Sequence, residues 1–151
     1  MSAEKNLSIL NINLPKAPDP VGSYVASKIV GNLIFISGQV SFNSKGELTK
    51  GKIGKELSLT EGQEAAKLCA LNILAQLKKK CGSLDNVKGC VKLTGYVNST
   101  DSFIDQPKVI NGASDLISSI FGDKGKHTRA AISVNSLPLG AAVEVDGIFE
   151  L

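Results

Sequence analysis

The chain has 151 residues, of which 42% are hydrophobic and 21% charged, and its formal net charge is +3 at pH 7. This length fits one domain, and so small a charge excludes the strongly basic surface typical of nucleic-acid-binding proteins. No apolar run approaches the roughly 18 residues of a membrane span, and residues 1–20 contain no hydrophobic signal core. We therefore expect a cytoplasmic protein that binds neither membrane nor nucleic acid.

The cysteines and the single histidine indicate neither a disulfide framework nor a zinc site. Cys69, Cys81 and Cys90 are odd in number, lack CxxC or Cys/His spacing, and are accompanied only by His127. The composition therefore favours a reducing compartment, and we expect no metal or cofactor.

Residues 1–16 are predicted to form an N-terminal arm that leads into a single domain over residues 17–151. Closely spaced prolines make the end of this arm extended. A β-hairpin follows, with strands over residues 24–30 and 33–37 joined by a Gly-Asn turn. Gly38 ends the second strand, where a glycine permits the close approach of another group to the backbone.

Residues 43–58 are polar, rich in glycine and lysine and without periodicity, which predicts a long surface loop with at most one short strand. Thr60 and Gln63 have the form of a capping box that opens a helix running to about Lys80. Lysines fall in its last turn, where cations suit the helix dipole, and Gly82 supplies the stop.

Residues 87–97 are predicted to form a third strand. A second helix starts near Pro107 and ends at Gly122. Two further strands, over residues 129–135 and 143–146, are predicted to form a closing hairpin around a Leu-Pro-Leu-Gly turn. The order β-β-α-β-α-β-β predicts an α+β fold in which two helices cover one face of a mixed sheet.

The closing strands carry the most suggestive charges. Side chains alternate between the two faces of a strand, so Ile132 and Val134 oppose Arg129, and Val143 opposes Glu144. If the strands pair with both apolar sets on one face, Arg129 and Glu144 share the other face. Such a pair could bind a small acid and act on it. Most charged residues on the polar face of a strand, however, are simply solvated or form weak ion pairs.

These segments resemble the RidA/YjgF family, also labelled endoribonuclease L-PSP, over roughly residues 17–150. The motifs that carry the resemblance are Gly22-Ser23-Tyr24, Ile36-Ser37-Gly38-Gln39, Asp85-Asn86-Val87-Lys88 and the stretch from Arg129 through Leu137-Pro138 to Val143-Glu144-Val145. Each motif is weak alone, but their order and spacing together are specific. The stretches 92–99 and 109–114 resemble a longer subgroup of that family.

The resemblance implies a chorismate-mutase-like fold and a homotrimer with a site in each inter-subunit cleft. It also implies cofactor-independent hydrolysis of 2-imino or enamino acids to 2-keto acids and ammonia. By matching position, Arg129 would bind the substrate carboxylate and Glu144 would hold or activate the attacking water. Ser37 and Tyr24 would line the pocket, and Asn111 corresponds more loosely. His127, two residues before the arginine, is a candidate for the pocket rim.

The chain also departs from the family pattern. Ala131 stands where many active members carry cysteine, the usual Gly-Pro-Tyr is Gly-Ser-Tyr, and residues 51–55 are inserted in the long loop. These departures leave open a non-catalytic trimer that binds a small carboxylate or serves as a scaffold. An endoribonuclease ranks last, because the chain has no histidine pair for acid–base cleavage of RNA.

Overall fold

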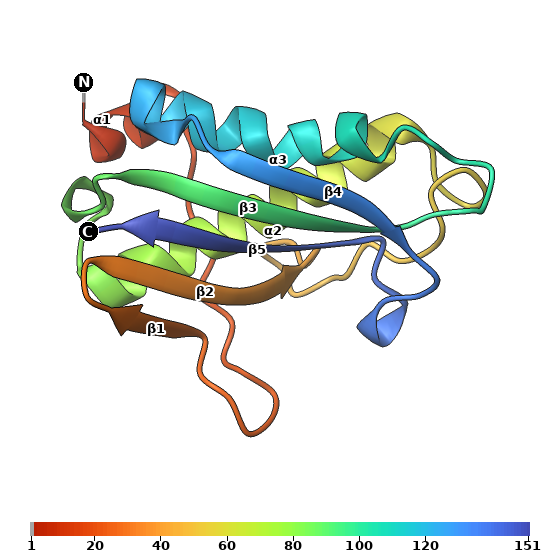
Figure 1. The fold of residues 1–151 in the computed structure, drawn as a ribbon, viewed down its shortest axis with the longest axis horizontal. Helices are drawn as coiled ribbons and strands as arrows, with labels where there is room; N and C mark the ends of the chain where they lie inside the picture. The colour runs from red at the N-terminus through yellow and green to blue at the C-terminus, as the bar shows by residue number, and fades with distance from the viewer. Residues whose placement is uncertain (1) are drawn as a thin grey trace.

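A five-stranded mixed sheet forms the centre of the protein in the computed structural model, which describes residues 2–151 (Figure 1). The strands are β1 (Ser27–Val30), β2 (Leu33–Val40), β3 (Gly89–Asn98), β4 (Thr128–Val134) and β5 (Val143–Glu150). They lie in the order β1-β2-β5-β3-β4, in which β3 and β4 are parallel and all other neighbours are antiparallel. The predicted α+β class is confirmed, and so is the order β-β-α-β-α-β-β along the chain, which follows a short N-terminal helix.

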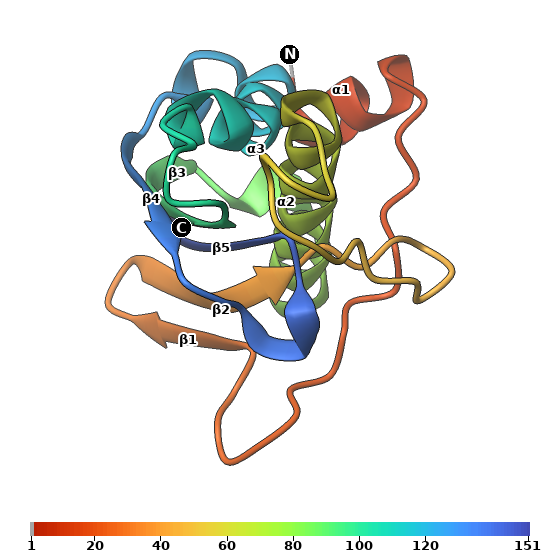
Figure 2. The same cartoon turned by 90° about the vertical axis from the view of Figure 1, so that its right-hand side faces the viewer.

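Two long helices, α2 (Leu59–Cys81) and α3 (Gln106–Phe121), cover one face of the sheet, and Figure 1 looks onto the face that no helix covers. The edge-on view of Figure 2 shows both helices on the same side. The core between the two layers is aliphatic, with Ile34, Ile73, Leu93 and Ile117 fully buried. Burial of these side chains is the main favourable term that holds the layers together.

Helix α2 starts two residues earlier than predicted. Ser58, not Thr60, is the N-cap: its hydroxyl accepts a hydrogen bond from the Glu61 backbone, and the Glu61 carboxylate accepts one from the Ser58 backbone. This reciprocal capping box satisfies two amide groups that the helix leaves free, so it outcompetes the similar pattern two residues on. The predicted stop at Gly82 is confirmed, with φ of 78°.

The predicted closing hairpin is wrong. Strand β4 pairs with β3 in parallel, whereas β5 lies between β2 and β3. Because α3 connects β3 to β4, these elements form a βαβ crossover, which places the second strand parallel to the first. The turn at Pro138–Gly140 therefore carries the chain from the sheet edge back to its centre.

Two segments outside the sheet are more ordered than their composition indicates. The N-terminal segment contains a short helix, α1 (Ala3–Ile9), whose Leu7 is buried in the core. The long loop has no regular strand, but its Ile53 is fully buried and forms an isolated bridge with Ser99 beside the end of β3. The buried Ile53 anchors this polar loop together with backbone hydrogen bonds from Ile53 to Asn98 and from Gly51 to Gly140.

Candidate functional site

Arg129 lies on β4 and its side chain faces helix α3. The register pairs it with Leu93, which is fully buried beneath the helices, and paired residues share a face of the sheet. Its Nη1 donates to Oδ1 of Asn111 at 2.8 Å and to Oγ of Ser114 at 3.0 Å, and its Nη2 donates to the Pro107 carbonyl at 3.2 Å. The structure therefore brings together two predicted site residues, Arg129 and Asn111.

The guanidinium has no acidic partner within residues 2–151. Arg129 is the only arginine of the chain, and all three acceptors around it are neutral. Three of its five N–H groups are used in these bonds, so two remain for a ligand. A fixed cation with free donors and no counter-charge is suited to binding a carboxylate.

Sequence reasoning missed Ser114 as a member of this group. It lies three residues after Asn111 on α3, and residues three apart share one face of a helix. A serine and an asparagine at that spacing, opposite a strand that carries the only arginine, are the signal that could have identified it. We call Arg129, Asn111 and Ser114 the arginine half-site.

Glu144 lies on β5 and faces the uncovered side of the sheet. It pairs with Tyr96 of β3, and its neighbours Val143 and Val145 are fully buried on the opposite face. Strand β2 beside it has a register irregularity between Ile36 and Gln39. A Cβ added at Gly38 would overlap Oε1 of Glu144, so the glycine leaves room for the carboxylate in the position it occupies. The predicted close approach at Gly38 is confirmed.

The Glu144 carboxylate is half-buried and held by packing rather than by partners. Burial raises its pKa, and the nearby charge of Asp146 raises it further. Within residues 2–151 no hydrogen bond or ion pair stabilises its ionised form. Asp146, in contrast, accepts a hydrogen bond from the Tyr96 hydroxyl at 3.0 Å. A carboxylate with a raised pKa and no partner is a good proton acceptor for a bound water.

Ser37 and Tyr24 lie beside Glu144. All three line an open cleft of about 830 Å³ on the uncovered face of the sheet. Ser37 donates its hydroxyl proton to the Val25 carbonyl at 2.7 Å, which leaves its oxygen free to accept a bond. Tyr24 is 51% exposed and borders a second cavity, of about 420 Å³, that also reaches Glu144. We call Glu144, Gly38, Ser37 and Tyr24 the glutamate half-site.

The expectation that Arg129 and Glu144 share one face is therefore wrong for a single chain. It assumed that Ile132 points into the core, but Ile132 pairs with Tyr96 on the uncovered face and is 48% exposed. Helix α3 covers the other face of β4, where Ala131 packs against the core and Arg129 donates its hydrogen bonds to α3. The half-sites lie on opposite faces.

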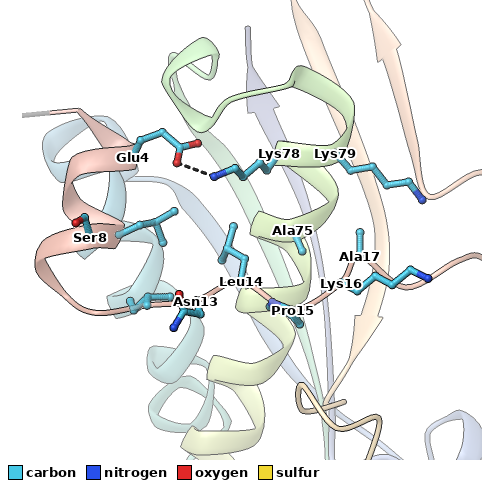
Figure 3. A pocket seen from close by; sticks show the side chains of 12 residues that line it. Glu4, Ser8, Asn13, Leu14, Pro15, Lys16, Ala17, Ala75, Lys78 and Lys79 are labelled. Carbon is cyan, nitrogen blue, oxygen red and sulfur yellow. Dashed lines mark hydrogen bonds and ion pairs between the residues drawn. The ribbon is translucent and has the colours of Figure 1, made fainter.

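A further cavity, of about 680 Å³, lies between α1 and the end of α2 (Figure 3). Lys78 beside it forms an ion pair with Glu4 at 2.8 Å, and Lys79 pairs with Asp19 at 3.1 Å. Both partners are acidic side chains of the N-terminal segment, so this lysine cluster is largely neutralised. The lining also includes the Ser8 hydroxyl, and the Glu4 carboxylate in it is already paired with Lys78.

Neither His127 nor Arg129 lines any of these cavities, so the predicted place of His127 at a pocket rim stays a prediction. The His127 ring contacts Ser114 and the Gly125 carbonyl. In the described part of the chain, no group of three or more histidine, cysteine or acidic side chains could hold a metal ion. No helix there is both long and apolar enough to cross a membrane.

Comparison with known families gives one match that spans nearly the whole chain. The family described as "YjgF/chorismate mutase-like, putative endoribonuclease" matches residues 4–151. A solved structure titled as a putative endoribonuclease from Shewanella oneidensis superposes with a TM-score of 0.96 at 35% identity, covering 100% of both chains.

Two relatives differ in whether their names state a reaction. Protein TCP17 of Trypanosoma cruzi is 48% identical over 97% of this chain and 92% of its own length. The 2-iminobutanoate/2-iminopropanoate deaminase of Dermatophagoides farinae is 27% identical over 91% of this chain and 92% of its own length. A named reaction thus occurs among distant relatives, whereas the name of the more similar TCP17 states none.

Proposed function

This chain belongs to the YjgF/chorismate mutase-like family, and we propose that it hydrolyses reactive 2-imino and enamino acids to 2-keto acids and ammonia. The observation that carries the proposal is the pair of half-sites. Among residues 2–151, one half-site holds a cation without a counter-charge, and the other holds a carboxylate without a partner. The deaminase name of a distant relative supports the same reaction.

Arg129 binds the substrate carboxylate in this scheme. Its two free N–H groups make charge-assisted bonds, each worth roughly 1.5–3 kcal/mol. Asn111 and Ser114 hold the guanidinium in place by accepting from its Nη1. The long side chain has therefore already lost its conformational entropy before the substrate binds.

Glu144 acts on water. Its carboxylate accepts a proton from the water as the water oxygen bonds to the imine carbon, and it passes this proton to the imine nitrogen, which gives a neutral carbinolamine. It then accepts the proton of the carbinolamine hydroxyl and passes it to the nitrogen, so that the C=O bond forms, the C–N bond breaks, and ammonia leaves with the 2-keto acid. The imine carbon is already electrophilic, so a positioned water and a suitable base suffice. No oxidant or cofactor enters the balance.

We further propose that the two half-sites meet between subunits of a homotrimer. The sheet separates them within one chain, and its uncovered face carries exposed Phe35 and Ile132. Burial of such residues between copies would bring the edge strand β4 of one subunit to the glutamate half-site of the next. Closed rings form when one surface of a subunit fits a different surface of its neighbour.

The first experiment measures release of 2-keto acid from freshly generated 2-aminoacrylate. At substrate concentrations below KM the wild-type protein should accelerate it above spontaneous hydrolysis, and Arg129→Ala should lose about 10²-fold of that acceleration. Arg129→Lys is the matched control, since it keeps the charge but lacks the planar fork. Acceleration that survives Arg129→Ala would refute the carboxylate-binding role.

The second experiment tests the shared site by mixing subunits. Arg129→Ala and Glu144→Gln proteins, each with activity about 10²-fold or more below wild type at low substrate concentration, are mixed, unfolded and refolded together. Every mixed trimer then contains one site with both groups intact. Equal random mixing should recover about a quarter of wild-type activity. No recovery from well-folded mixed trimers would show that the two groups do not act across one subunit boundary.

A carboxylate-binding protein without turnover is the second candidate. Ala131 favours it, because many active members of the family carry cysteine there. Thermal stabilisation by a 2-keto acid without imine hydrolysis would establish it, and the stabilisation should grow with ligand concentration.

An endoribonuclease has less support. Its acid–base chemistry would need a histidine pair, whereas the chain has a single histidine. The densest lysine cluster is largely paired with acidic residues. RNA cleavage that vanished in Glu144→Gln would restore this candidate.

A further inference from the structure

A chain of hydrogen bonds runs from His127 through Ser114 to Arg129. The His127 Nδ1 lies 2.6 Å from the Gly125 carbonyl oxygen, and its Nε2 lies 3.0 Å from Oγ of Ser114. The same Oγ lies 3.0 Å from Nη1 of Arg129. The residues come from three places, with His127 just before β4, Ser114 on α3 and Gly125 in the turn between them.

The donors and acceptors in this chain can be assigned from their chemistry. A carbonyl oxygen only accepts hydrogen bonds, so Nδ1 carries a proton and donates a hydrogen bond to the Gly125 carbonyl. A guanidinium only donates, so Oγ of Ser114 accepts from Arg129. With a neutral imidazole, Nε2 is then an acceptor and accepts a hydrogen bond from the Ser114 hydroxyl. Every bond in the chain has one direction, and the Gly125 carbonyl ends it.

We propose that His127 is a positioning residue for Arg129. It holds the Ser114 hydroxyl proton on the side away from the guanidinium, so a serine lone pair stays aimed at Nη1. The two free N–H groups of Arg129 then keep the orientation in which they bind a carboxylate. This inference rests on the proposed function, because it gives His127 a role in presenting that cation.

Loss of the acceptor at Nε2 should loosen the arginine. A serine in a helix can turn its hydroxyl proton to the carbonyl four residues earlier, which here belongs to Ile110. Arg129 would then keep Asn111 and Pro107 as acceptors but lose a well-aligned third one. The effect should fall on carboxylate binding, since His127 lies on the arginine half-site and makes no contact with Glu144.

A pair of histidine substitutions separates positioning from packing. His127→Asn can keep the bond to the Gly125 carbonyl but has no acceptor at the position of Nε2. His127→Gln can place its amide oxygen near that position. We expect His127→Asn to weaken binding of 2-oxobutanoate about fivefold and to raise KM for imine hydrolysis equally, with kcat within twofold of wild type. His127→Gln should restore most of the loss.

Ser114→Ala provides an independent arm. If the two residues act through one chain, Ser114→Ala alone should match His127→Asn, and the double variant should be no worse than Ser114→Ala. Additive losses, a fall in kcat alone, or unchanged binding in both single variants would overturn the proposal. Thermal melting of each variant shows whether it folds, and Ser114→Ala carries the test if His127→Asn does not.

Calorimetric titration with 2-oxobutanoate distinguishes failure of the positioning role of His127 from failure of the proposed function. If Arg129→Ala loses binding but the His127 and Ser114 variants keep it, the positioning role fails and the function stands. If wild-type protein binds the keto acid but hydrolyses no imine, the deaminase fails and the binding series still decides the role of His127.

Discussion

The two half-sites are held in place by different forces. In the arginine half-site the charged group is fixed by three hydrogen bonds to neutral acceptors on α3. In the glutamate half-site the carboxylate has no such partner and is confined by burial and by the backbone of Gly38. Hydrogen bonds fix a direction, which suits recognition. Desolvation without partners raises a pKa, which suits proton transfer.

The two half-sites also differ in how their environments treat the charged group. Three hydrogen bonds to α3 fix the Arg129 guanidinium before a ligand binds. Glu144 is left in an environment that disfavours its charge, and such strain is typical of catalytic groups. We therefore expect substitutions in the arginine half-site to change affinity, and those in the glutamate half-site to change rate.

The largest effect is expected for Glu144→Gln. Loss of a general base costs typically 10²–10⁴-fold in rate, and kcat should fall in that range while KM changes little. Steady-state kinetics on 2-aminoacrylate measures both. For the wild type, the acid limb of the pH profile should lie above the ordinary glutamate range, because burial raises the pKa of Glu144. A large change in KM with kcat intact would reverse the roles assigned to the two half-sites.

The same variant should be more stable than the wild type at neutral pH. The raised pKa of Glu144 means that the folded state favours the protonated form. That contribution to stability is complete below the unfolded pKa and is lost as the pH rises through the folded pKa. A neutral glutamine avoids the loss, so the melting temperature should exceed that of wild type at pH 7. The difference should vanish below pH ~4.

Arg129→Ala should follow in size. Loss of two charge-assisted bonds of roughly 1.5 kcal/mol each corresponds to about 10²-fold in kcat/KM. The loss should appear as a raised KM, since the carboxylate is bound equally before and during the reaction. Titration with 2-oxobutanoate gives the matching loss in affinity. An effect confined to kcat would mean that the guanidinium acts on the reacting carbon instead.

Gly38→Ala tests how closely the glutamate half-site is packed. The new methyl group would displace the Glu144 carboxylate, and a displacement of about 1 Å can cost up to 10²-fold in rate. Because the change acts through Glu144, it should add nothing in the Glu144→Gln background. A further loss in that background would show that Gly38 acts by some other route, such as folding of β2.

The smallest effect concerns the substrate side chain. The cavity of about 420 Å³ beside Glu144 is lined largely by apolar residues, among them Val21, Phe42 and Leu139. Each added methylene should contribute about 0.8 kcal/mol, or roughly fourfold in kcat/KM, along a series of straight-chain 2-imino acids. Leu139→Ala should flatten this slope, whereas Arg129→Lys should leave it unchanged. A flat series in the wild type would exclude the cavity as the side-chain site.

Features that depend on neighbouring residues could be predicted from the sequence. The periodicity of apolar residues identified both long helices, Gly82 identified the end of α2, and Gly38 was recognised as a point of close approach. The family motifs indicated the fold, since their spacing reflects the whole domain. The capping box was misplaced by two residues, because two patterns of a hydroxyl followed three residues later by Glu or Gln overlap at Ser58 and Thr60.

Partners distant in the sequence were decided only by the tertiary structure. Alternation along β4 shows two faces but not which one meets the helices, and the rule that apolar residues face the core failed at Ile132 because β4 is an edge strand. The insertion of β5 between β2 and β3, the anchoring of Ile53 and the chain from His127 to Arg129 likewise depend on non-local packing. Residue types and local patterns determined which groups can do chemistry; strand order decided which of them lie together, because it sets the neighbours of each side chain.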